Sequence, residues 1–409
     1  MGITNTADIE LSPPWTPEGH LRAHEWYAAL QEKGPVAIDQ QSGIWQFLGY
    51  DAVREFLFHP ENWSTAKRLE TVPQELRVVR LLTSDPPQHL KLRSHFSSAY
   101  RPKRSTEMAE RVRSVCSALI DKCLEKREFD LIADFAKPLT VTMISEIIGI
   151  PDNERHYMHP LMADSYLGRV DTSGDGSLKK ALYPGGAQPG SELIFPYLED
   201  LIARRRAAPE DDLISALVQI QPGQMKERLD IPALLTEQFG AGQNTTVHVF
   251  GSLILMLDRN RDQYRRLRQN PDLMPSAVEE AIRLHSPLQA RPRIAMHDIT
   301  LPGGETIREG AVGLGWIGAA NVDSAQFERP MEFDPGRNPN PHIGFGYGEH
   351  FCLGAHLARL ELRIALETWQ EKIGDFEQVD DSSVGWLDDF IVHGLRQYRI
   401  RVKPTGATA

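Results

Sequence analysis

Apolar residues recur with helical spacing along most of this chain, while strand-like patterns are short and few. The spacing predicts helices over residues 90–99 and 107–150, with Pro151 ending the second stretch. Residues 232–257 form the longest and most apolar helical segment, so we expect this helix to cross the core. Runs typical of strands lie at residues 36–39, 44–48, 299–301 and 311–316. The pattern therefore predicts several helices and a few short strands.

Turn and linker signals divide the chain into elements but not into domains. Gln-Gln-Ser-Gly between the first two strand-like runs predicts a hairpin, and Asp51 is expected to cap a short helix that ends near His59. Gly, Ser and Pro interrupt the helical pattern over residues 171–190, and we expect the polar residues 1–15 to be flexible. Because no Ser/Gly-rich or charged linker separates folded halves, residues 1–409 are predicted to form a single domain.

Composition argues against several classes of protein. The net charge of −11 argues against nucleic acid as the main partner. Three cysteines fit a reducing compartment without disulfides, and Cys116 and Cys123 are expected to pack in the interior. The first residues show no secretory signal, and the longest apolar run, residues 247–257, is too short to span a membrane. We therefore expect a soluble, cytoplasmic and monomeric protein that does not bind membranes.

The stretch with the clearest chemical signal runs from residue 342 to 361 and reads HIGFGYGEHFCLGAHLARLE. Its glycines allow a tight, irregular loop, and helix-forming residues follow, so Cys352 lies where a loop leads into a helix. The helix dipole and free backbone N–H groups at such a position favour a thiolate. From these residues alone, the alternative is an inert buried cysteine in a glycine-rich turn.

Two further pairs of polar residues have helical spacing. His89 and Arg93 stand four residues apart, so both side chains can reach one ligand, although a solvated polar face has the same spacing. Glu280 and Arg283 can form an ion pair, which alone would be an ordinary surface salt bridge. Gly242 lies inside the long apolar helix, where glycine is unfavourable, and indicates that another group approaches the backbone closely.

Residues 345–354, FGYGEHFCLG, resemble the haem-binding loop of the cytochrome P450 family. The matching positions are Phe345, Gly346, Gly348, His350, Cys352 and Gly354. The resemblance implies the cytochrome P450 fold, mainly α with a smaller β-rich region, around one b-type haem, with the Cys352 thiolate as the axial ligand to iron. Five family markers occur along essentially the whole chain, in the order that the family has them. They are His89 with Arg93, the long apolar helix, Glu280 with Arg283, Arg293 and the cysteine loop.

The resemblance also implies roles for individual residues. The expected haem contacts are His89, Arg93, Ala241, Arg293, Phe345, Gly346, His350, Cys352 and Gly354. Residues 171–190 are expected to form a mobile connection above a substrate pocket, although the residues themselves fit disorder without function equally well. The expected pocket residues are Leu82, Glu237, Gly240, Leu288, Gln289, Ile391 and Val392. The residues expected to brace the cysteine loop from behind are Glu280, Arg283 and Arg337.

The long helix departs from the family pattern at one position. Family members carry an acid followed by a threonine over the haem, whereas this chain has Asn244 before Thr245. An amide can hold water by hydrogen bonds but cannot take up and release a proton as a carboxylate does. We expect Thr245 and water to deliver protons, with Asn244 ordering the water. Glu237, two turns earlier and about 10 Å away along the axis, is too distant to replace the acid.

The implied reaction is reductive activation of O2 and insertion of one oxygen atom into an unactivated C–H bond. The expected substrate is a largely apolar small molecule with polar groups, such as a terpenoid, steroid, fatty acid or polyketide. Because no flavin or ferredoxin region is appended, electrons are expected from a separate ferredoxin-type partner with its reductase. Cations that would receive an acidic ferredoxin, or would simply be solvated, are Arg101, Lys103, Arg104 and Arg359.

Two alternatives to this reaction stay open. The first is a haem-thiolate enzyme that uses peroxide, or that performs carbon–carbon coupling or ring closure, and Asn244 favours it. The second is a haem-based sensor that binds its ligand without turnover.

Overall fold

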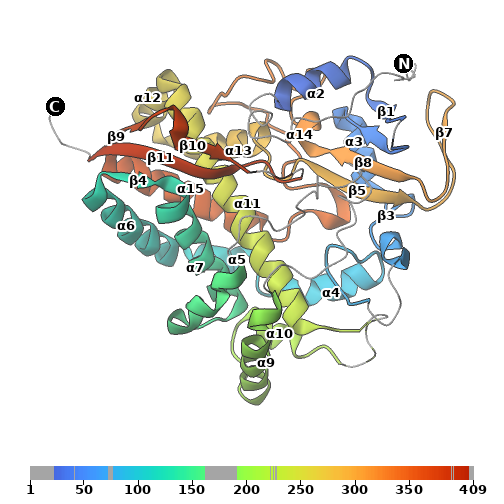
Figure 1. Cartoon of the computed structure of the whole chain (residues 1–409), viewed down its shortest axis with the longest axis horizontal. Coiled ribbons are helices and arrows are strands. Elements are labelled where there is room, and N and C mark those ends of the chain that lie inside the picture. The colour runs from blue at the N-terminus through green and yellow to red at the C-terminus, as the bar shows by residue number, and fades with distance from the viewer. Residues whose placement is uncertain are drawn as a thin grey trace.

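Helices predominate and strands are short in the computed structural model of the chain, which confirms the mainly α fold with a smaller β-rich region (Figure 1). The described residues are 23–40, 42–71, 77–161, 191–221, 223, 225, 228–387, 389 and 391–404. Residues 1–15 and 171–190, which the sequence predicts to be flexible or mobile, lie outside them.

The helices form the larger part of the fold. Their bounds are α2 Ala23–Gln31, α3 Tyr50–Phe58, α4 Gln88–Ser97, α5 Pro102–Glu107, α6 Ala109–Lys126, α7 Lys137–Ile148, α9 Ser191–Ala207, α10 Leu213–Leu217, α11 Ile231–Arg259, α12 Arg261–Gln269, α13 Met274–Leu284, α14 Ile317–Ala320 and α15 Ala355–Lys372. Shorter helical segments are η1 Lys67–Thr71, η3 Leu131–Ala136, η4 Asp152–Leu161, η5 Pro271–Leu273, η6 Gly348–His350 and η7 Asp381–Ser383.

The strands form two main sheets and one small ribbon. Their bounds are β1 Val36–Ile38, β2 Trp45–Phe47, β3 Trp63–Ser64, β4 Glu128–Asp130, β5 Ala290–Ala295, β6 Ile299–Thr300, β7 Thr306–Ile307, β8 Val312–Trp316, β9 Ile373–Gln378, β10 Val384–Trp386 and β11 Leu395–Pro404. The first sheet has the order β1-β2-β8-β5-β3, in which only the β2–β8 pair is parallel. The second has the order β10-β11-β4, with β9 also paired to β11, and β6 pairs with β7.

The predicted N-terminal hairpin is present, but the predicted helix cap is wrong. Strands β1 and β2 are antiparallel, with Val36 opposite Phe47. The helix that follows begins at Tyr50, with Gly49 as its N-cap, so Asp51 lies inside the first turn. The Tyr50 N–H is instead satisfied by the carboxylate of Asp323 at 2.8 Å. A side chain far along the chain has taken the capping role that local sequence suggested for Asp51.

Helix α11 runs through the middle of the molecule, between α7 on one side and the β5–β8 sheet on the other (Figure 1). Its start is set by Asp230, whose carboxylate accepts from the Ala233 N–H at 3.0 Å. A side chain at Gly242 would lie 2.6 Å from Cδ1 of Ile144 in α7, so glycine there allows the two helices to pack closely. The close approach predicted from a mid-helix glycine is therefore a helix–helix contact.

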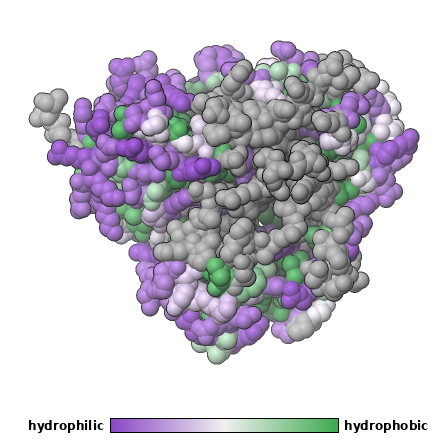
Figure 2. Space-filling model, in the orientation of Figure 1, coloured by the Kyte–Doolittle hydropathy of each residue, from purple (hydrophilic) through white to green (hydrophobic). Residues whose placement is uncertain are grey.

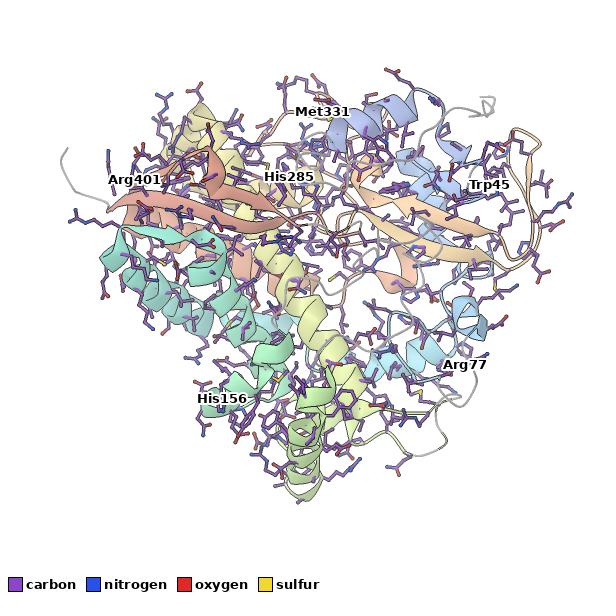
Figure 3. All side chains as sticks on the ribbon, in the orientation of Figure 1. Trp45, Arg77, His156, His285, Met331 and Arg401 are labelled. Carbon is purple, nitrogen blue, oxygen red and sulfur yellow. The ribbon has the colours of Figure 1, made fainter. Side chains whose placement is uncertain are left out.

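Buried side chains form one large core around α6, α11, α13 and α15, with further clusters around α9 and under the first sheet. Cys116 and Cys123 lie in the large core, which confirms their predicted packing role, and burial raises the pKa of Cys123 to about 12. Figure 3 places His285 centrally, while Met331 and Arg401 lie at the periphery. Much of the coloured surface in Figure 2 is hydrophilic, and within the described residues no helix combines the length and apolarity that crossing a membrane requires.

Candidate active site

A cavity lies between α11 and the loop that precedes α15. It contains about 1590 Å³ of space outside the protein atoms and is partly open to solvent. Its α11 wall includes Gly240, Ala241, Asn244 and Thr245, and the cysteine loop contributes Cys352. This space includes open solvent at the mouth of the cavity, and it brings the α11 wall and the cysteine sulfur to one site.

Backbone hydrogen bonds and two glycines shape the loop around Cys352. The Gly346 N–H donates to the Ile343 carbonyl at 2.8 Å, and the Cys352 N–H donates to the Phe345 carbonyl at 2.8 Å. Gly346 and Gly348 have φ values of 77° and 70°, in the left-handed region that glycine adopts without a Cβ clash. Helix α15 begins three residues after the cysteine. The loop conformation explains why this stretch is rich in glycine.

The Cys352 side chain faces the cavity. Cys352 is an exposed residue that lines this cavity. Burial raises the pKa of the Cys352 thiol, whereas a hydrogen bond from the Gly354 backbone and the charges of Arg291, Arg93 and Arg359 oppose that shift. These groups would favour the thiolate once a metal cation binds there.

Two histidines and three arginines line the cavity near Cys352. The ring centroids of His89 and His350 lie 4.2 Å apart. Among the described residues, neither ring nitrogen of the fully buried His89 has a hydrogen-bond partner, and Nε2 of His350 has none. Burial, together with the charge of Arg93, lowers the pKa of His89 to about 4. Burial and the charge of Arg293 lower the pKa of His350 to about 2, so both imidazoles are neutral near pH 7.

The chemistry of this set of side chains fits a haem. A haem carries two carboxylates, which need N–H donors and positive charge. Arg93 and Arg293 supply positive charge, and the unpartnered nitrogens of His89 and His350 supply donors. Part of Arg93 is already oriented, because its guanidinium donates to the Phe351 carbonyl at 2.8 Å. The cavity thus offers donors for both carboxylates and a cysteine sulfur for the iron.

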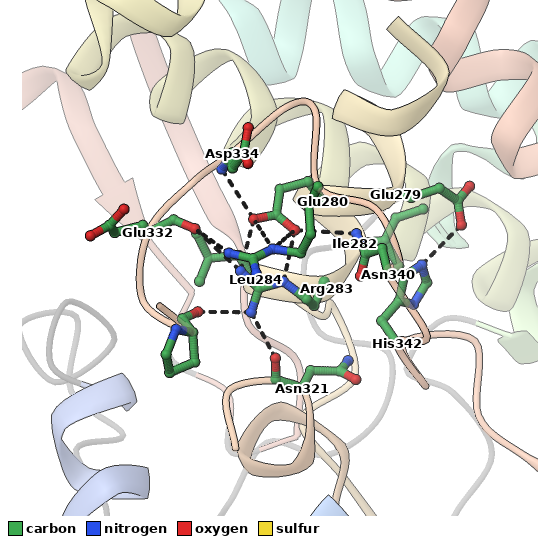
Figure 4. Close-up of polar contacts among 12 residues, drawn as sticks. Glu279, Glu280, Ile282, Arg283, Leu284, Asn321, Glu332, Asp334, Asn340 and His342 are labelled. Atoms are coloured by element: carbon green, nitrogen blue, oxygen red, sulfur yellow. Dashed lines mark hydrogen bonds and ion pairs between the residues drawn. The ribbon is translucent and has the colours of Figure 1, made fainter. Parts of the chain in front are cut away.

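Behind the cysteine loop, Glu280 and Arg283 of α13 form a fully buried ion pair (Figure 4). The Arg283 guanidinium donates to both carboxylate oxygens at 2.7 and 2.8 Å. Arg337 donates to the same carboxylate at 3.0 Å, and the Asp334 N–H donates at 3.1 Å. The remaining Arg283 donors reach the carbonyls of Asn321, Pro330 and Glu332. All five Arg283 donors therefore have acceptors, as a buried charge requires.

A second ion pair, which sequence reasoning missed, ties α13 to α15. Glu279 accepts from Arg359 at 2.7 and 2.8 Å and from His342 at 2.9 Å. The same guanidinium lies 4.4 Å from the centre of the Phe345 ring. Arg359, which the sequence left as either a docking cation or a solvated one, links α13 to α15 and lies over the Phe345 ring of the cysteine loop.

The other cations named for a docking surface differ in how closely they interact with neighbouring acceptors. Arg104 pairs with Asp211 at 2.8 Å. Arg101 donates to the Ser98 carbonyl at 3.1 Å. Lys103 lies 3.7 Å from a carboxylate oxygen of Glu107, and its side chain is 89% exposed. Of Arg104 and Lys103, the lysine therefore has the longer ion-pair distance and the more exposed side chain.

Asn244 and Thr245 bring polar groups to the cavity from α11. The Thr245 hydroxyl donates to the Ala241 carbonyl at 2.9 Å, one turn earlier in the helix. The hydroxyl oxygen keeps its capacity to accept a hydrogen bond from the cavity. Asn244 is 6% exposed, and its side-chain nitrogen has no partner among the described residues. A buried amide in this state can donate to a ligand or to water.

Glu237 does not line the cavity, contrary to the sequence prediction. Leu82, Gly240, Leu288 and Val392, which were also expected at the pocket, do line it. The Glu237 carboxylate instead accepts from the backbone N–H groups of Leu81 and Leu82 at 3.1 Å each. It therefore fastens the segment before α4 to α11.

Gln289 and Ile391 also lie behind the cavity wall rather than in it. The Gln289 side chain accepts from the Tyr27 hydroxyl and donates to the Ser286 carbonyl. Ile391 packs in the large core, and its carbonyl accepts from the Gln289 N–H at 2.8 Å. Their neighbours Leu288 and Val392 face the cavity because adjacent residues of an extended backbone point to opposite sides.

Glu361 is a cavity residue to which sequence reasoning gave no role. It lies in α15, lines the cavity and is 4% exposed. Leu357, Glu361, Ala365 and Thr368 share one buried stripe of this helix. A charged residue on an apolar stripe is the sequence signal that would have singled it out.

Comparisons with known proteins agree with this site. The cytochrome P450 family model matches residues 191–370. Putative cytochrome P450 YjiB of Bacillus subtilis is 34% identical over 382 residues, covering 92% of this chain and 93% of the relative. Mycinamicin IV hydroxylase/epoxidase of Micromonospora griseorubida is 33% identical over 383 residues, covering 90% and 92%. The crystal structure of CYP109E1 from Bacillus megaterium in complex with testosterone has a TM-score of 0.84 at 28% identity, covering 94% of this chain and 99% of that one.

The fold, the cysteine-lined cavity and these relatives define a haem-dependent monooxygenase that acts on small molecules. The chain belongs to the cytochrome P450 family.

Proposed function

We propose that this P450 hydroxylates a largely apolar small molecule, with electrons supplied by a separate ferredoxin and its reductase. The observation that carries this proposal is a single cavity lined by Cys352, by the polar groups of Asn244 and Thr245, and by apolar side chains. We infer a monomer in the cytoplasm, where a reducing environment suits the free thiols of Cys116 and Cys123.

A haem held in this cavity supplies reductive activation of O2, in which O2, two electrons and two protons convert R–H into R–OH and water. Cys352 binds its iron. His89, Arg93, Arg293 and His350 bind its carboxylates, and the apolar walls exclude bulk water from the reacting centre. The buried network of Glu280 behind the loop holds the cysteine in place.

Thr245 and Asn244 order water next to the haem in this proposal. The Thr245 hydroxyl donates to Ala241, so its oxygen accepts from a water in the cavity. The unpartnered Asn244 nitrogen donates to the same water. Neither side chain titrates near neutral pH, so the pair positions protons but does not store one.

The proposed substrates are steroids, fatty acids, terpenoids or polyketides. The apolar part of the cavity wall includes Leu81, Leu82, Val249, Leu288 and Val392. Structural relatives support the steroids and fatty acids: CYP109E1 was solved with testosterone and with corticosterone, and P450BioI with an acyl carrier protein bearing hexadec-9Z-enoic acid. A molecule of this kind would fill the space beside the haem.

Substrate screening tests the proposal. The purified holoenzyme is titrated with each compound class, and the change in haem absorbance that accompanies substrate entry is recorded. Compounds that bind are incubated with ferredoxin, reductase and labelled O2, and products are analysed by mass spectrometry. A product that carries one labelled oxygen supports the proposal. Tight binding of a compound without any product or oxygen consumption would show a ligand sensor instead.

A haem-thiolate enzyme that uses peroxide is the second candidate, and Asn244 is the observation that favours it. An amide in place of the acid removes a proton store from α11, and peroxide already carries the protons that reduction of O2 requires. Efficient product formation with hydrogen peroxide, and none with ferredoxin and reductase, would select this second reaction.

Thr245→Ala tests the role of the helix hydroxyl. We expect more hydrogen peroxide per electron pair and a product rate lower by about tenfold or more, since positioned proton transfer contributes roughly 10²–10⁴-fold. Thr236→Ala is a matched control, because Thr236 lies in the same helix and its hydroxyl donates to the Ala233 carbonyl at 2.9 Å. Unchanged coupling in Thr245→Ala would exclude this role.

A further inference from the structure

The wall of the main cavity carries more positive charge than a haem balances. Arg93, Arg291 and Arg293 all line it, and arginine stays protonated in proteins. Among the described residues, Glu361 is the single acidic side chain in this wall, and burial raises the pKa of its carboxyl well above the ordinary value. That carboxyl is uncharged near neutral pH, so the charge of the three arginines is not offset by the wall itself.

A haem brings negative charge to this wall only through its two carboxylates. The charge of a ferric iron is balanced by the porphyrin ring together with the Cys352 thiolate. The imidazoles of His89 and His350 are uncharged near neutral pH, because their pKa values are about 4 and 2. With three arginines and two haem carboxylates, one positive charge is left for another ligand to balance.

Arg93 and Arg293 belong to the group of side chains that receives the haem carboxylates. After burial, the charges that act on His89 include those of Arg93 and Arg293 but not that of Arg291. On His350, after burial, the charge of Arg293 acts most strongly and that of Arg291 more weakly. Arg93 and Arg293 therefore flank the two histidines, and Arg291 lies to one side of them.

Strand β5 places Arg291 between the polar end of the cavity and its apolar wall. Arg291 and Arg293 are two residues apart, so they lie on the same face of the strand, about 7 Å apart along it. On the other side of Arg291, just before the strand, Leu288 lines the cavity and is bridged to Val392, which lines it too. A ligand that contacts Arg291 and these apolar side chains has a negative group attached to an apolar body.

We propose that Arg291 binds a carboxylate of the substrate, so that the preferred substrate is an amphipathic carboxylic acid. The guanidinium donates to both carboxylate oxygens in a charge-assisted contact, and the apolar body of the acid lies along Leu82, Leu288 and Val392. The carboxylate supplies the negative charge that the haem does not. This inference rests on the proposed hydroxylation, since it names the substrate class of the same cavity.

Titration of the holoenzyme with matched ligands tests this recognition without turnover. Hexadecanoic acid, 5β-cholanic acid and abietic acid are each compared with their methyl esters, which keep the apolar body but carry no charge. Dissociation constants are read from the change in haem absorbance. We expect at least one acid to bind about tenfold or more tightly than its ester. Equal affinity of every acid and its ester, or no absorbance change with any acid, would overturn the inference.

Substitutions at Arg291 test whether this side chain is the anchor. Arg291→Met should abolish the preference for the acid and leave the affinity for the ester as in the wild type. Arg291→Lys keeps a positive charge but loses the planar fork, so it should retain part of the preference. Arg399→Met is the matched control, because Arg399 also lies in a strand but pairs with Glu128 at 2.7 Å on the surface. An Arg291→Met protein that still prefers the acid would exclude Arg291 as the anchor.

Transfer of haem to an acceptor protein separates a substrate anchor from a further haem contact. Arg291→Met should release haem as slowly as the wild type, whereas Arg293→Met should release it faster. Faster release from Arg291→Met, matching that from Arg293→Met, would assign Arg291 to the haem carboxylates and overturn the inference.

The outcomes also separate this inference from the proposed function. If acids bind preferentially through Arg291 but no compound is oxygenated, the anchor stands and the hydroxylase is excluded. If acids and esters bind and are hydroxylated equally well, the hydroxylase stands and the anchor is excluded.

Discussion

Behind the cysteine loop, Glu280 is enclosed by Arg283 and Arg337, and every donor of Arg283 has an acceptor. In the cavity wall, His89 and Glu361 are as deeply buried but have no hydrogen-bond partner among the described residues. The two regions lie on either side of one short loop. Their polar groups therefore differ in pairing and not in burial.

This difference in hydrogen-bond pairing indicates which region binds a ligand and which only supports the fold. A buried polar group without a partner costs about 1–3 kcal/mol, so a fold accumulates such groups only where something else supplies the partner. The network of Glu280 is complete within the protein and ties α13 to the segment between Asn321 and Arg337. The cavity wall also holds polar groups without a partner among the described residues, such as the ring of His89, and a bound ligand could supply their partners.

Breaking the fully paired network around Glu280 should have the largest effect on the free energy of unfolding. We expect Arg283→Met to lower the free energy of unfolding by about 3–5 kcal/mol, because it leaves part of the Glu280 charge buried without compensation. Urea unfolding followed by circular dichroism measures this change. Arg308→Met is the control, since it removes a solvent-exposed pair with Asp298, worth at most about 1 kcal/mol. Equal effects of the two substitutions would show that the network is not structural.

Removing an unpartnered group should affect cofactor binding more than folding. His89→Leu deletes a donor to a haem carboxylate, a contact worth about 1.5–3 kcal/mol. We expect haem to dissociate to an acceptor protein about 10–100 times more readily, with little change in the unfolding of the haem-free protein. His59→Leu, at a partly exposed histidine paired with Glu55 and Glu61, is the control. A loss of stability in His89→Leu without weaker haem binding would contradict the comparison.

The smallest effect on stability is expected at the ion pair between Glu279 and Arg359, and it should depend on pH. Burial alone would raise the pKa of Glu279, but hydrogen bonds from His342 and Arg359 outweigh it and hold the pKa at about 2. The carboxylate therefore contributes stability above its unfolded pKa of about 4.5, and loses that contribution as pH falls toward 2. The stability difference between wild type and Glu279→Gln should shrink over this range. A difference that is constant with pH would contradict the pairing.

The main features of the fold could be predicted because they depend on local pattern. Gly346 and Gly348 adopt positive φ, and this requirement is visible in the sequence as a glycine-rich run before a helix. The apolar stretch that became α11 is continuous, so its central position followed from its composition. Gly242 predicted a close contact at this point of the helix. Only the structure identifies Ile144 as the group that approaches it.

Side-chain direction could not be predicted, because it depends on partners far along the chain. Gln289 turns away from the cavity toward Tyr27, which lies in α2. The Glu237 carboxylate accepts hydrogen bonds from the backbone N–H groups of Leu81 and Leu82 and so points away from the cavity. Glu361 was overlooked for the same reason, since its burial arises from the packing of α15 against the cavity and α11.

The central claim is that Cys352 binds the haem iron through its sulfur. The absorbance spectrum of the reduced, carbon-monoxide-bound protein tests it most directly, with Cys352→Ala compared with the wild type. Cys116→Ala, at a fully buried cysteine of the core, is the control and should keep the wild-type spectrum. We predict the thiolate–haem spectrum in the wild type and its complete loss in Cys352→Ala. A Cys352→Ala protein that retained this spectrum would contradict the account.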